Sequence, residues 1–157
     1  MIQVRLAELG EAAGVAAVLL ESFLEFRPLY TEGGFAATTP GVEQIRVRMK
    51  EGPVWVALRD GVMVGTVSGV VDGESAYIRG MAVVPAVRGS GAGSRLLQQV
   101  ESWAARDAAV RMFLSTTPFL GAAIRLYEGA GFRRSADGPQ ELFGTPLFTM
   151  VKSVSKE

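Results

Sequence analysis

The stretch MAVVPAVRGSGAGSRLL, residues 81–97, decides the fold of this chain. It starts as an apolar run rich in β-branched residues, passes a proline and a glycine-rich loop, and continues with the periodicity of a helix. The stretch therefore predicts a strand, a loop and the N-terminus of a helix. Gly89, Gly91 and Gly93 allow positive φ and leave room for a ligand beside the backbone N–H groups of the loop.

The predicted loop is a candidate anion-binding site. The first turn of a helix has N–H groups without intrahelical partners, the helix dipole favours negative charge there, and Arg88 adds a full positive charge. Two common phosphate motifs do not match. A P-loop needs a lysine where this chain has Ser94, and a dinucleotide fingerprint needs a glycine where it has Leu96. For the glycines alone, a turn that only lets a strand pack closely on a helix is an equally good interpretation.

Composition narrows the class of protein. The chain has 157 residues, of which 48% are hydrophobic, so we expect a single domain over residues 1–157 with a sizeable core. Sixteen basic residues balance sixteen acidic ones, which predicts a small-molecule partner and no nucleic acid. No leader or membrane-length apolar run is present, so we expect a cytoplasmic protein that contacts no membrane. The chain contains no Cys and no His, which excludes thiolate nucleophiles, His-based triads and the usual zinc ligands, and we expect no metal.

Periodicity and turn signals predict an alternation of strands and helices. Strands are expected over residues 2–6, 54–58, 62–71, 76–84 and 111–116, with a final hairpin from 132–135 and 142–152 across the loop 136–141. Helices are expected over residues 12–26, ended by Pro28, over 42–51, from Gly91 for about four turns, and over 120–130. Residues 29–35 are expected to form a loop. Asp60-Gly61 predicts a tight hairpin, and the strand-helix-strand crossover after residue 76 predicts two parallel strands.

Two motifs, occurring in order, resemble those of a known family. Residues 88–93, Arg-Gly-Ser-Gly-Ala-Gly, resemble the Arg/Gln-x-x-Gly-x-Gly/Ala signature of the GCN5-related N-acetyltransferase (GNAT) superfamily. Residues 123–132, Ala-Ile-Arg-Leu-Tyr-Glu-Gly-Ala-Gly-Phe, resemble its Ala-x-x-Leu-Tyr-Glu-x-x-Gly-Phe helix. The resemblance implies an α+β fold with a central twisted mixed sheet of about six to seven strands and about four helices on both faces. It also implies that the sheet is splayed at its two central parallel strands.

The resemblance further implies acetyl-CoA as the cosubstrate and a set of residues that bind it. Arg88 and the loop Gly89, Ser90, Gly91, Ala92, Gly93 and Ser94 would bind the pyrophosphate. The strand Met81, Ala82 and Val83 would pair with the pantetheine arm as if it were an added strand, and one of its N–H groups would stabilise the oxyanion. This arrangement requires the parallel strands to separate. Gly80 is where a bulge could begin the separation, and continuous pairing past Val83 would contradict it.

Tyr127 resembles the general acid of the family, which would protonate the departing thiolate. Many family members carry a Glu on the strand before the loop, but residues 76–81 contain no carboxylate. The general base therefore stays open among Glu21, Glu25, Glu32, Glu74 and water alone.

Two further residues are candidates for binding the acceptor. Arg79 either binds a carboxylate or phosphate of the acceptor or faces solvent beside an acidic neighbour. Tyr30 lies in the predicted loop 29–35, where a substrate could be met.

These observations predict an acetyl-CoA-dependent N-acetyltransferase. It would move an acetyl group to an amine of a small molecule, or to a peptide N-terminus, by direct attack in a ternary complex. The alternatives are a catalytically weak acyl-CoA-binding module with a sensing or partner role, and an unrelated α/β phosphate-binding protein. Residues 23–39 and 136–145 are expected to determine acceptor specificity. The sequence leaves open the acceptor, the use of longer acyl-CoAs, and whether the protein is a monomer or a homodimer.

Overall fold

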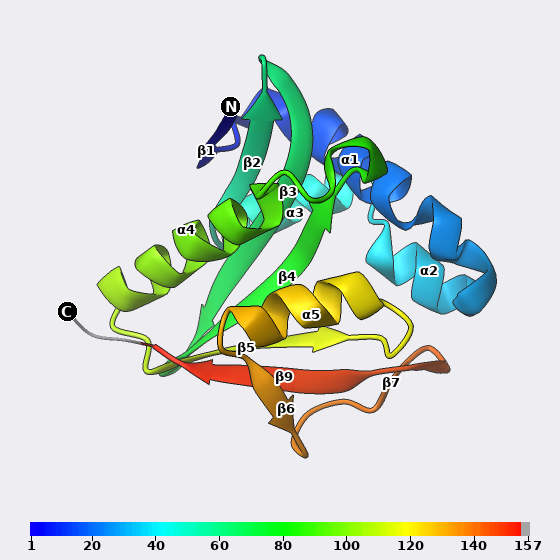
Figure 1. Cartoon of the computed structure of the whole chain (residues 1–157), viewed down its shortest axis with the longest axis vertical. Helices are drawn as coiled ribbons and strands as arrows, with labels where there is room; N and C mark the ends of the chain where they lie inside the picture. The colour runs from blue at the N-terminus through cyan, green and yellow to red at the C-terminus, as the bar shows by residue number, and fades with distance from the viewer. Residues whose placement is uncertain (155–157) are drawn as a thin grey trace.

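The computed structural model describes residues 1–154 and is built around a seven-stranded mixed sheet in the order β1-β2-β3-β4-β5-β9-β6. The strands of this sheet are β1 (Ile2–Leu6), β2 (Val54–Arg59), β3 (Val62–Asp72), β4 (Ser75–Val83), β5 (Arg111–Thr116), β6 (Arg133–Ser135) and β9 (Phe148–Ser153). A separate small hairpin is formed by β7 (Glu141–Leu142) and β8 (Thr145–Pro146). Among the described strands, β4 and β5 form the single parallel pair. In Figure 1 the first four strands form the upper part of the sheet, and β5, β9 and β6 form the lower part.

Helices cover both faces of the sheet. The α-helices are α1 (Ala12–Phe23), α2 (Glu32–Thr38), α3 (Val42–Glu51), α4 (Ala92–Arg106) and α5 (Gly121–Gly129), and short 3₁₀ turns are η1 (Leu9–Glu11), η2 (Leu24–Leu29) and η3 (Pro85–Val87). Figure 1 shows α4 in front of the sheet and α3 behind β3. Gly69 of β3 faces α4, because a Cβ there would lie 2.5 Å from Trp103. Successive residues on a strand point to opposite faces, so the neighbouring Ser68 faces α1 and α3.

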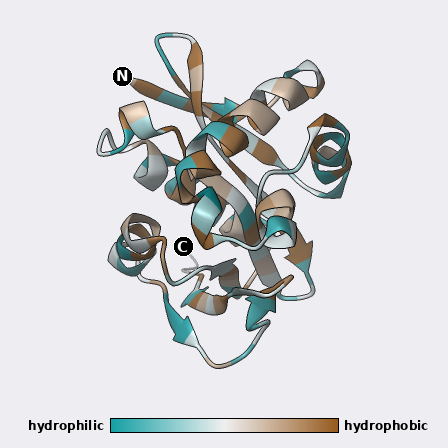
Figure 2. Ribbon diagram, turned by 90° about the vertical axis from the view of Figure 1, so that its right-hand side faces the viewer, coloured by the Kyte–Doolittle hydropathy of each residue, from teal (hydrophilic) through white to brown (hydrophobic). Residues whose placement is uncertain are grey.

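The described helices carry hydrophobic residues toward the sheet. Figure 2 shows hydrophobic and hydrophilic residues alternating around the helices, as expected where amphipathic helices pack on a core. On α4 the residues turned to the core are fully or nearly fully buried: Ala92, Leu96, Leu97, Val100 and Ala104. No helix in residues 1–154 has the length and apolar character needed to cross a membrane.

The two parallel strands separate soon after they meet, as predicted. Their pairing covers Ser75↔Arg111 to Tyr77↔Phe113, although β4 continues to Val83. Gly80 has φ +63°, and the register between β3 and β4 shifts by one residue next to it. A bulge is therefore present at Gly80, where glycine accepts the positive φ that other residues avoid. The bulge turns the second half of β4 away from β5.

Several local predictions are confirmed. Asp60 and Gly61 both have positive φ and join β2 to β3 in a tight hairpin. The strand predicted at residues 76–84 is β4, and the helix predicted from Gly91 is α4, whose N-cap is Gly91 with φ +89°. The hairpin between β6 and β9 is also present.

The first predicted helix was too long. It ends at Phe23 and continues as the 3₁₀ turn η2, which contains Pro28. Proline has no N–H for an α-helical bond and disfavours α geometry at the preceding residue, so the chain leaves the α-helix before reaching it. The end of the second hairpin also differs from the prediction, because the end of β7, β8 and β9 replace one continuous strand at residues 142–152. Pro146, which cannot donate to a ladder, is the last residue of β8.

The predicted loop at residues 29–35 was wrong, because α2 begins at Glu32. The hydroxyl of Thr31 accepts the N–H of Gly34 at 3.0 Å and caps the helix. The two glycines, which suggested a loop, serve close packing instead. A Cβ on Gly34 would lie 2.2 Å from Oγ1 of Thr145, so the helix contacts β8 through its bare backbone.

Candidate active site

Two cavities lie beside the separated parts of β4 and β5. The first has a volume of about 570 Å³ and lies between the glycine-rich loop, the end of α1 and α5. The second has a volume of about 360 Å³ and is bordered by α2, α3, residues 77–81 of β4 and β7. The cavities share five lining residues, which are Phe23, Met81, Leu120, Ala123 and Tyr127. The two spaces therefore meet at one place, beside the bulge.

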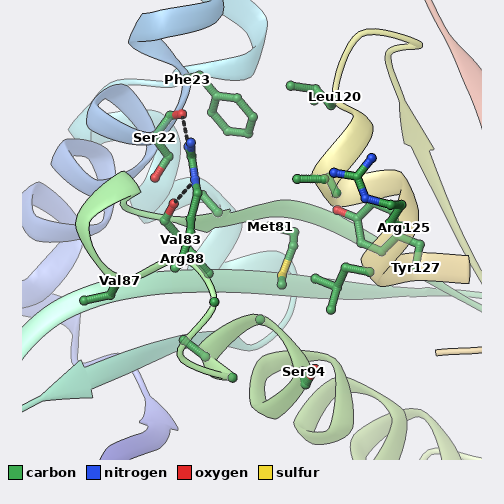
Figure 3. A pocket seen from close by; sticks show the side chains of 18 of the residues that line it. Ser22, Phe23, Met81, Val83, Val87, Arg88, Ser94, Leu120, Arg125 and Tyr127 are labelled. Carbon is green, nitrogen blue, oxygen red and sulfur yellow. Dashed lines mark hydrogen bonds between the residues drawn. The ribbon is translucent and has the colours of Figure 1, made fainter. Parts of the chain in front are cut away.

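The first cavity gathers the residues that were expected to bind the coenzyme. Of the ten, all except Ser90 line it: Met81, Ala82, Val83, Arg88, Gly89, Gly91, Ala92, Gly93 and Ser94. Figure 3 shows Met81 between Arg88 on one side and Tyr127 on the other, with Ser94 on α4 below. The chain thus brings together segments that the sequence placed on a strand, a loop and two helices.

The glycine-rich loop has the geometry of an anion-binding site. Gly89 and Gly91 have φ values of +82° and +89°, which only glycine adopts readily. The first α-helical bond of α4 runs from the N–H of Arg95 to the carbonyl of Gly91, at 3.0 Å. The N–H groups of residues 92–94 therefore precede the helical bonds and are available to an anion at the positive end of the dipole.

Gly93 has a different role from the other two glycines. A Cβ at this position would lie 2.8 Å from Cδ2 of Leu126, so its absence lets the start of α4 pack against α5. Met81 also lies close, with its terminal methyl 3.4 Å from the same point. The close contact brings the N–H groups of the loop and the side chains of α5 to one cavity.

The guanidinium of Arg88 is bound by the protein itself. Its Nη2 donates to the carbonyl of Ser22 at 2.8 Å, its Nε donates to the carbonyl of Val83 at 3.3 Å, and it forms an ion pair with Glu25. Figure 3 shows the side chain extending from the loop to the end of α1. Arg88 therefore fixes the loop to α1, while its charge stays at the border of the first cavity.

Tyr127 is held in place by the C-terminus of α5. The N–H of Phe132 donates to the carbonyl of Tyr127 and that of Gly131 donates to Glu128, both at 3.0 Å, while Gly131 has φ +100°. This is a Schellman motif, in which Gly131 adopts the left-handed conformation that ends the helix. The rings of Tyr127 and Phe132 pack edge to face with centroids 6.1 Å apart.

The environment of Tyr127 keeps its phenol protonated. The side chain is only 6% exposed, yet it lines both cavities. Burial raises the pKa of this phenol well above its usual value, and the nearby phenol of Tyr30 raises it further. The neutral phenol is a hydrogen-bond donor at the meeting point of the two spaces.

Aromatic and charged side chains line the second cavity. Tyr30 packs edge to face on Phe119, with centroids 4.9 Å apart, and burial raises its pKa. Arg79 lines this cavity but forms an ion pair with Glu51 of α3, so the structure contains the acidic neighbour considered for it. Arg48 of α3 lines the same cavity and was not found from the sequence.

The carboxylates proposed from the sequence do not reach the site. Of the four, Glu21, Glu25, Glu32 and Glu74, none lines either cavity. The lining of the second cavity instead includes Glu141, at the start of β7. Glu141 lies within residues 136–145, which were expected to determine acceptor specificity, and this position was the signal in the sequence that could have identified it. No motif marked the residue itself. In the described part of the chain, no group of three His, Cys, Asp or Glu residues could hold a metal ion.

The chain belongs to the acetyltransferase (GNAT) family, whose model matches residues 15–132. A search of curated protein sequences finds no match. The resemblance predicted from the motifs at residues 88–93 and 123–132 is thus confirmed at the level of the family.

Solved structures share the fold over nearly the whole chain. The paiA N-acetyltransferase of Thermoplasma acidophilum, in complex with coenzyme A, has a TM-score of 0.81 at 17% identity, covering 98% of this chain and 99% of that one. The putative acetyltransferase yncA of Salmonella typhimurium, with its cofactor acetyl-CoA, has a TM-score of 0.75 at 23% identity, covering 99% and 95%. The ribosomal-protein-S18-alanine N-acetyltransferase of Escherichia coli has a TM-score of 0.71 at 16% identity, covering 100% and 96%. The predicted α+β fold with its splayed sheet is therefore confirmed.

Proposed function

We propose that this protein transfers an acetyl group from acetyl-CoA to the amine of a small molecule by direct attack within a ternary complex. The observation that carries the proposal is the meeting of two cavities at Met81 and Tyr127. One cavity has an anion-binding loop, and the other has aromatic and charged side chains. An acyl donor and an acceptor that enter from opposite sides would bring their reacting atoms together there.

The first cavity fits acetyl-CoA in two respects. The free N–H groups of residues 92–94 suit its diphosphate. The edge of β4 that β5 leaves after Tyr77 runs through Met81–Val83, and its backbone groups can pair with an extended amide-containing arm. Both coenzyme-bound relatives named above support this use of the fold. When bound, acetyl-CoA supplies a thioester whose carbonyl the amine attacks.

Each step of the transfer has a candidate group in the chain. A backbone N–H of Met81–Val83 donates to the oxygen that becomes negative when the amine attacks. The phenol of Tyr127 then donates to the sulfur as the carbon–sulfur bond breaks. A thiol has a pKa of about 8.5, so a phenol with a raised pKa is the weaker acid and acts mainly through its hydrogen bond. A neutral amine loses one proton when it is acetylated, and the departing sulfur takes up one. Coenzyme A therefore leaves as the thiol with no net release of protons.

Glu141 is the proposed acceptor of the proton from the amine. It is the carboxylate that lines the second cavity within the described residues, and its side chain is exposed enough to exchange the proton with water. An exposed carboxylate can work directly or through one water molecule. This assignment replaces the four candidates considered from the sequence.

The test is the release of coenzyme A thiol from acetyl-CoA when the purified protein is supplied with a panel of small amines. Amine-dependent release, with mass-spectrometric detection of the N-acetyl product, is the expected result. Stabilisation by acetyl-CoA without any release would instead support the alternative of a binding module with a sensing role. If saturating acetyl-CoA left the melting temperature unchanged, coenzyme binding itself would be excluded.

A further inference from the structure

The second cavity contains more positive than negative side chains. Among its described lining residues, Arg48 and Arg79 are cationic and Glu141 is anionic. Glu51, which does not line the cavity, pairs with Arg79 and so compensates one of the two cations. Arg48 has no ion pair of its own within residues 1–154, and Glu51 acts on it only at longer range.

Arg48 is half-buried and has no partner inside the protein. Within residues 1–154, its guanidinium forms no hydrogen bond and no ion pair. Burial lowers its pKa and the nearby positive charge of Arg79 lowers it further, whereas Tyr77 and Glu51 raise it by smaller amounts. A guanidinium keeps its charge in proteins, so this cation is costly in its present surroundings and favours an anion from outside.

The position of Arg48 relates this cation to the reaction centre. Its Nη1 lies 3.0 Å from the place that a Cβ on Gly80 would occupy, so the missing side chain at the bulge makes room for the guanidinium. Gly80 directly precedes Met81, which lines both cavities. An anion on Arg48 would therefore lie close to the point where acceptor and acyl donor meet.

We propose that the acceptors are amines that also carry a carboxylate, as free amino acids do, and that Arg48 binds this carboxylate. The inference rests on the proposed acetyl transfer for the assignment of the second cavity to the acceptor. In an amino acid, amine and carboxylate are attached to the same carbon, so a carboxylate on Arg48 leaves the amine near Met81. Arginine binds a carboxylate with two parallel hydrogen bonds, which orients the acceptor. The volume of about 360 Å³ and the aromatic lining fit one amino acid with an apolar side chain.

The test compares leucine, methionine and phenylalanine with their C-terminal amides, which keep size and amine but lose the charge. For the wild-type protein, we expect kcat/KM to be about 10- to 100-fold higher for the acid than for the amide, as expected for a charged hydrogen-bonded pair. The amide also represents a peptide N-terminus. Equal or better use of the amides would overturn the proposal and favour peptide acceptors.

Variants assign the effect to Arg48. Arg48→Gln is expected to remove the preference for acids, mainly through KM, and Arg48→Lys to retain part of it. Arg46→Gln is the matched control, because Arg46 lies on the same helix, is exposed, pairs with Glu43 and lines neither cavity. A loss of activity of the same size for acids and amides in both Arg48 variants would show that Arg48 is only structural. If the protein acetylated a phosphonate analogue of phenylalanine as efficiently as phenylalanine itself, a carboxylate-specific site would be excluded.

Calorimetry separates this inference from the proposed function. The same acids and amides are titrated into protein saturated with coenzyme A, so that binding is measured without turnover. Arg48-dependent binding of the acids without any thiol release would contradict the acetyl transfer and support the anion site. Amine acetylation without Arg48-dependent preference would support the transfer and refute the anion site.

Discussion

At the scale of single residues, Tyr127 connects the two cavities. Its ring is packed on Phe132 and its backbone is fixed by the Schellman motif, so the phenol is held in position where the two cavities meet. Burial raises its pKa, which means that the phenol stays protonated through the ordinary assay range. A donor that does not ionise can serve the departing sulfur at any pH where the amine is reactive.

Tyr127→Phe should lower kcat by about 10- to 100-fold, because a hydrogen bond to a group that gains negative charge typically contributes about 1.5–3 kcal/mol. The dissociation constant of acetyl-CoA should change less than about threefold, since the ring that lines the first cavity remains. Steady-state kinetics with calorimetry measures both. In the wild-type protein, the rate should not decline between about pH 7 and 9.5 through loss of a phenolic proton, because the raised pKa keeps this group neutral. A kcat within twofold of wild type would exclude Tyr127 as the hydrogen-bond donor to the departing sulfur.

Glu141→Gln tests the proposed proton acceptor. We expect kcat/KM to fall about 10- to 100-fold near pH 7 and less at higher pH, because amines with pKa near 10 then arrive increasingly unprotonated. The pH profile of kcat/KM measures this difference. Glu74→Gln, at one of the positions suggested by the sequence, lies outside both cavities and should leave the profile unchanged. An identical drop at every pH would indicate a role of Glu141 in binding alone.

At the scale of elements, the site depends on how the loop enters α4. Gly91 serves as N-cap with φ +89°, so the chain turns sharply into α4, and residues 92–94, whose N–H groups precede the helical bonds, line the first cavity. A residue with a Cβ that is held at this positive φ is destabilised by about 1–2 kcal/mol, and the backbone shifts to relieve the strain. The strain would therefore act on the same groups that are proposed to hold the diphosphate.

Gly91→Ala should weaken acetyl-CoA binding about tenfold or more, measured by calorimetry. Gly73→Ala is the matched control, because Gly73 also has positive φ, at +63°, and open space around it, but lies in the turn between β3 and β4. Both variants should lose similar stability in urea titrations, whereas only the first should lose affinity. Equal affinity in the two variants would show that these N–H groups do not bind the coenzyme.

At the scale of the whole molecule, distant segments close the second cavity together. Thr31 donates from its hydroxyl to the carbonyl of Phe143 at 2.7 Å, and its N–H donates to Oγ1 of Thr145 at 2.9 Å. The buried Gly34 completes this contact between α2 and the β7–β8 hairpin. These contacts, between residues more than 110 positions apart, hold together α2 and the β7–β8 hairpin, which form one wall of the second cavity, the proposed acceptor site.

Gly34→Ala should disturb this wall, because the added methyl would meet Thr145. Overpacking typically costs about 1–3 kcal/mol, which corresponds to a Tm lower by roughly 3–10 °C for a chain of this length. We also expect a raised KM for the acceptor, with acetyl-CoA affinity retained. Differential scanning calorimetry and kinetics measure these effects, and Gly10→Ala, with no atom within 4 Å of its Cβ, is the control. Indistinguishable values for the two variants would mean that the wall does not constrain the acceptor.

The sequence predicted features whose causes are local. Asp60-Gly61 determines a hairpin by its own backbone preference, Gly80 marked the bulge, and residues 81–97 carry the signals of strand, loop and helix in order. Features that depend on distant contacts were missed. The glycines of α2 suggested a loop because the partner that requires them, Thr145, is remote in sequence.

The same distinction applies to the candidate site. Tyr127 and the glycine-rich loop lie within recognisable motifs, so the sequence could nominate them. Arg48 and Glu141 have no such motif, and they reach the second cavity only because α3 and β7 fold against the bulge and the end of β5. Arg79 was proposed to bind the acceptor, but the sequence did not reveal that Glu51 forms an ion pair with it. Charge compensation between elements is not visible until the elements are placed.

Because β4 and β5 separate early, the stability of the folded protein depends on the concentration of a ligand that binds between them. Three residue pairs join these strands, so a wedge-shaped opening remains in the middle of the hydrogen-bonded ladder. A ligand that inserts there supplies the bridging bonds that the polypeptide omits, and it binds only the native state. At a concentration one hundred times its dissociation constant, such a ligand contributes about 2.7 kcal/mol of resistance to unfolding. If acetyl-CoA binds there as proposed, the protein is most resistant to unfolding when this acyl donor is abundant and becomes more susceptible to unfolding as its concentration falls.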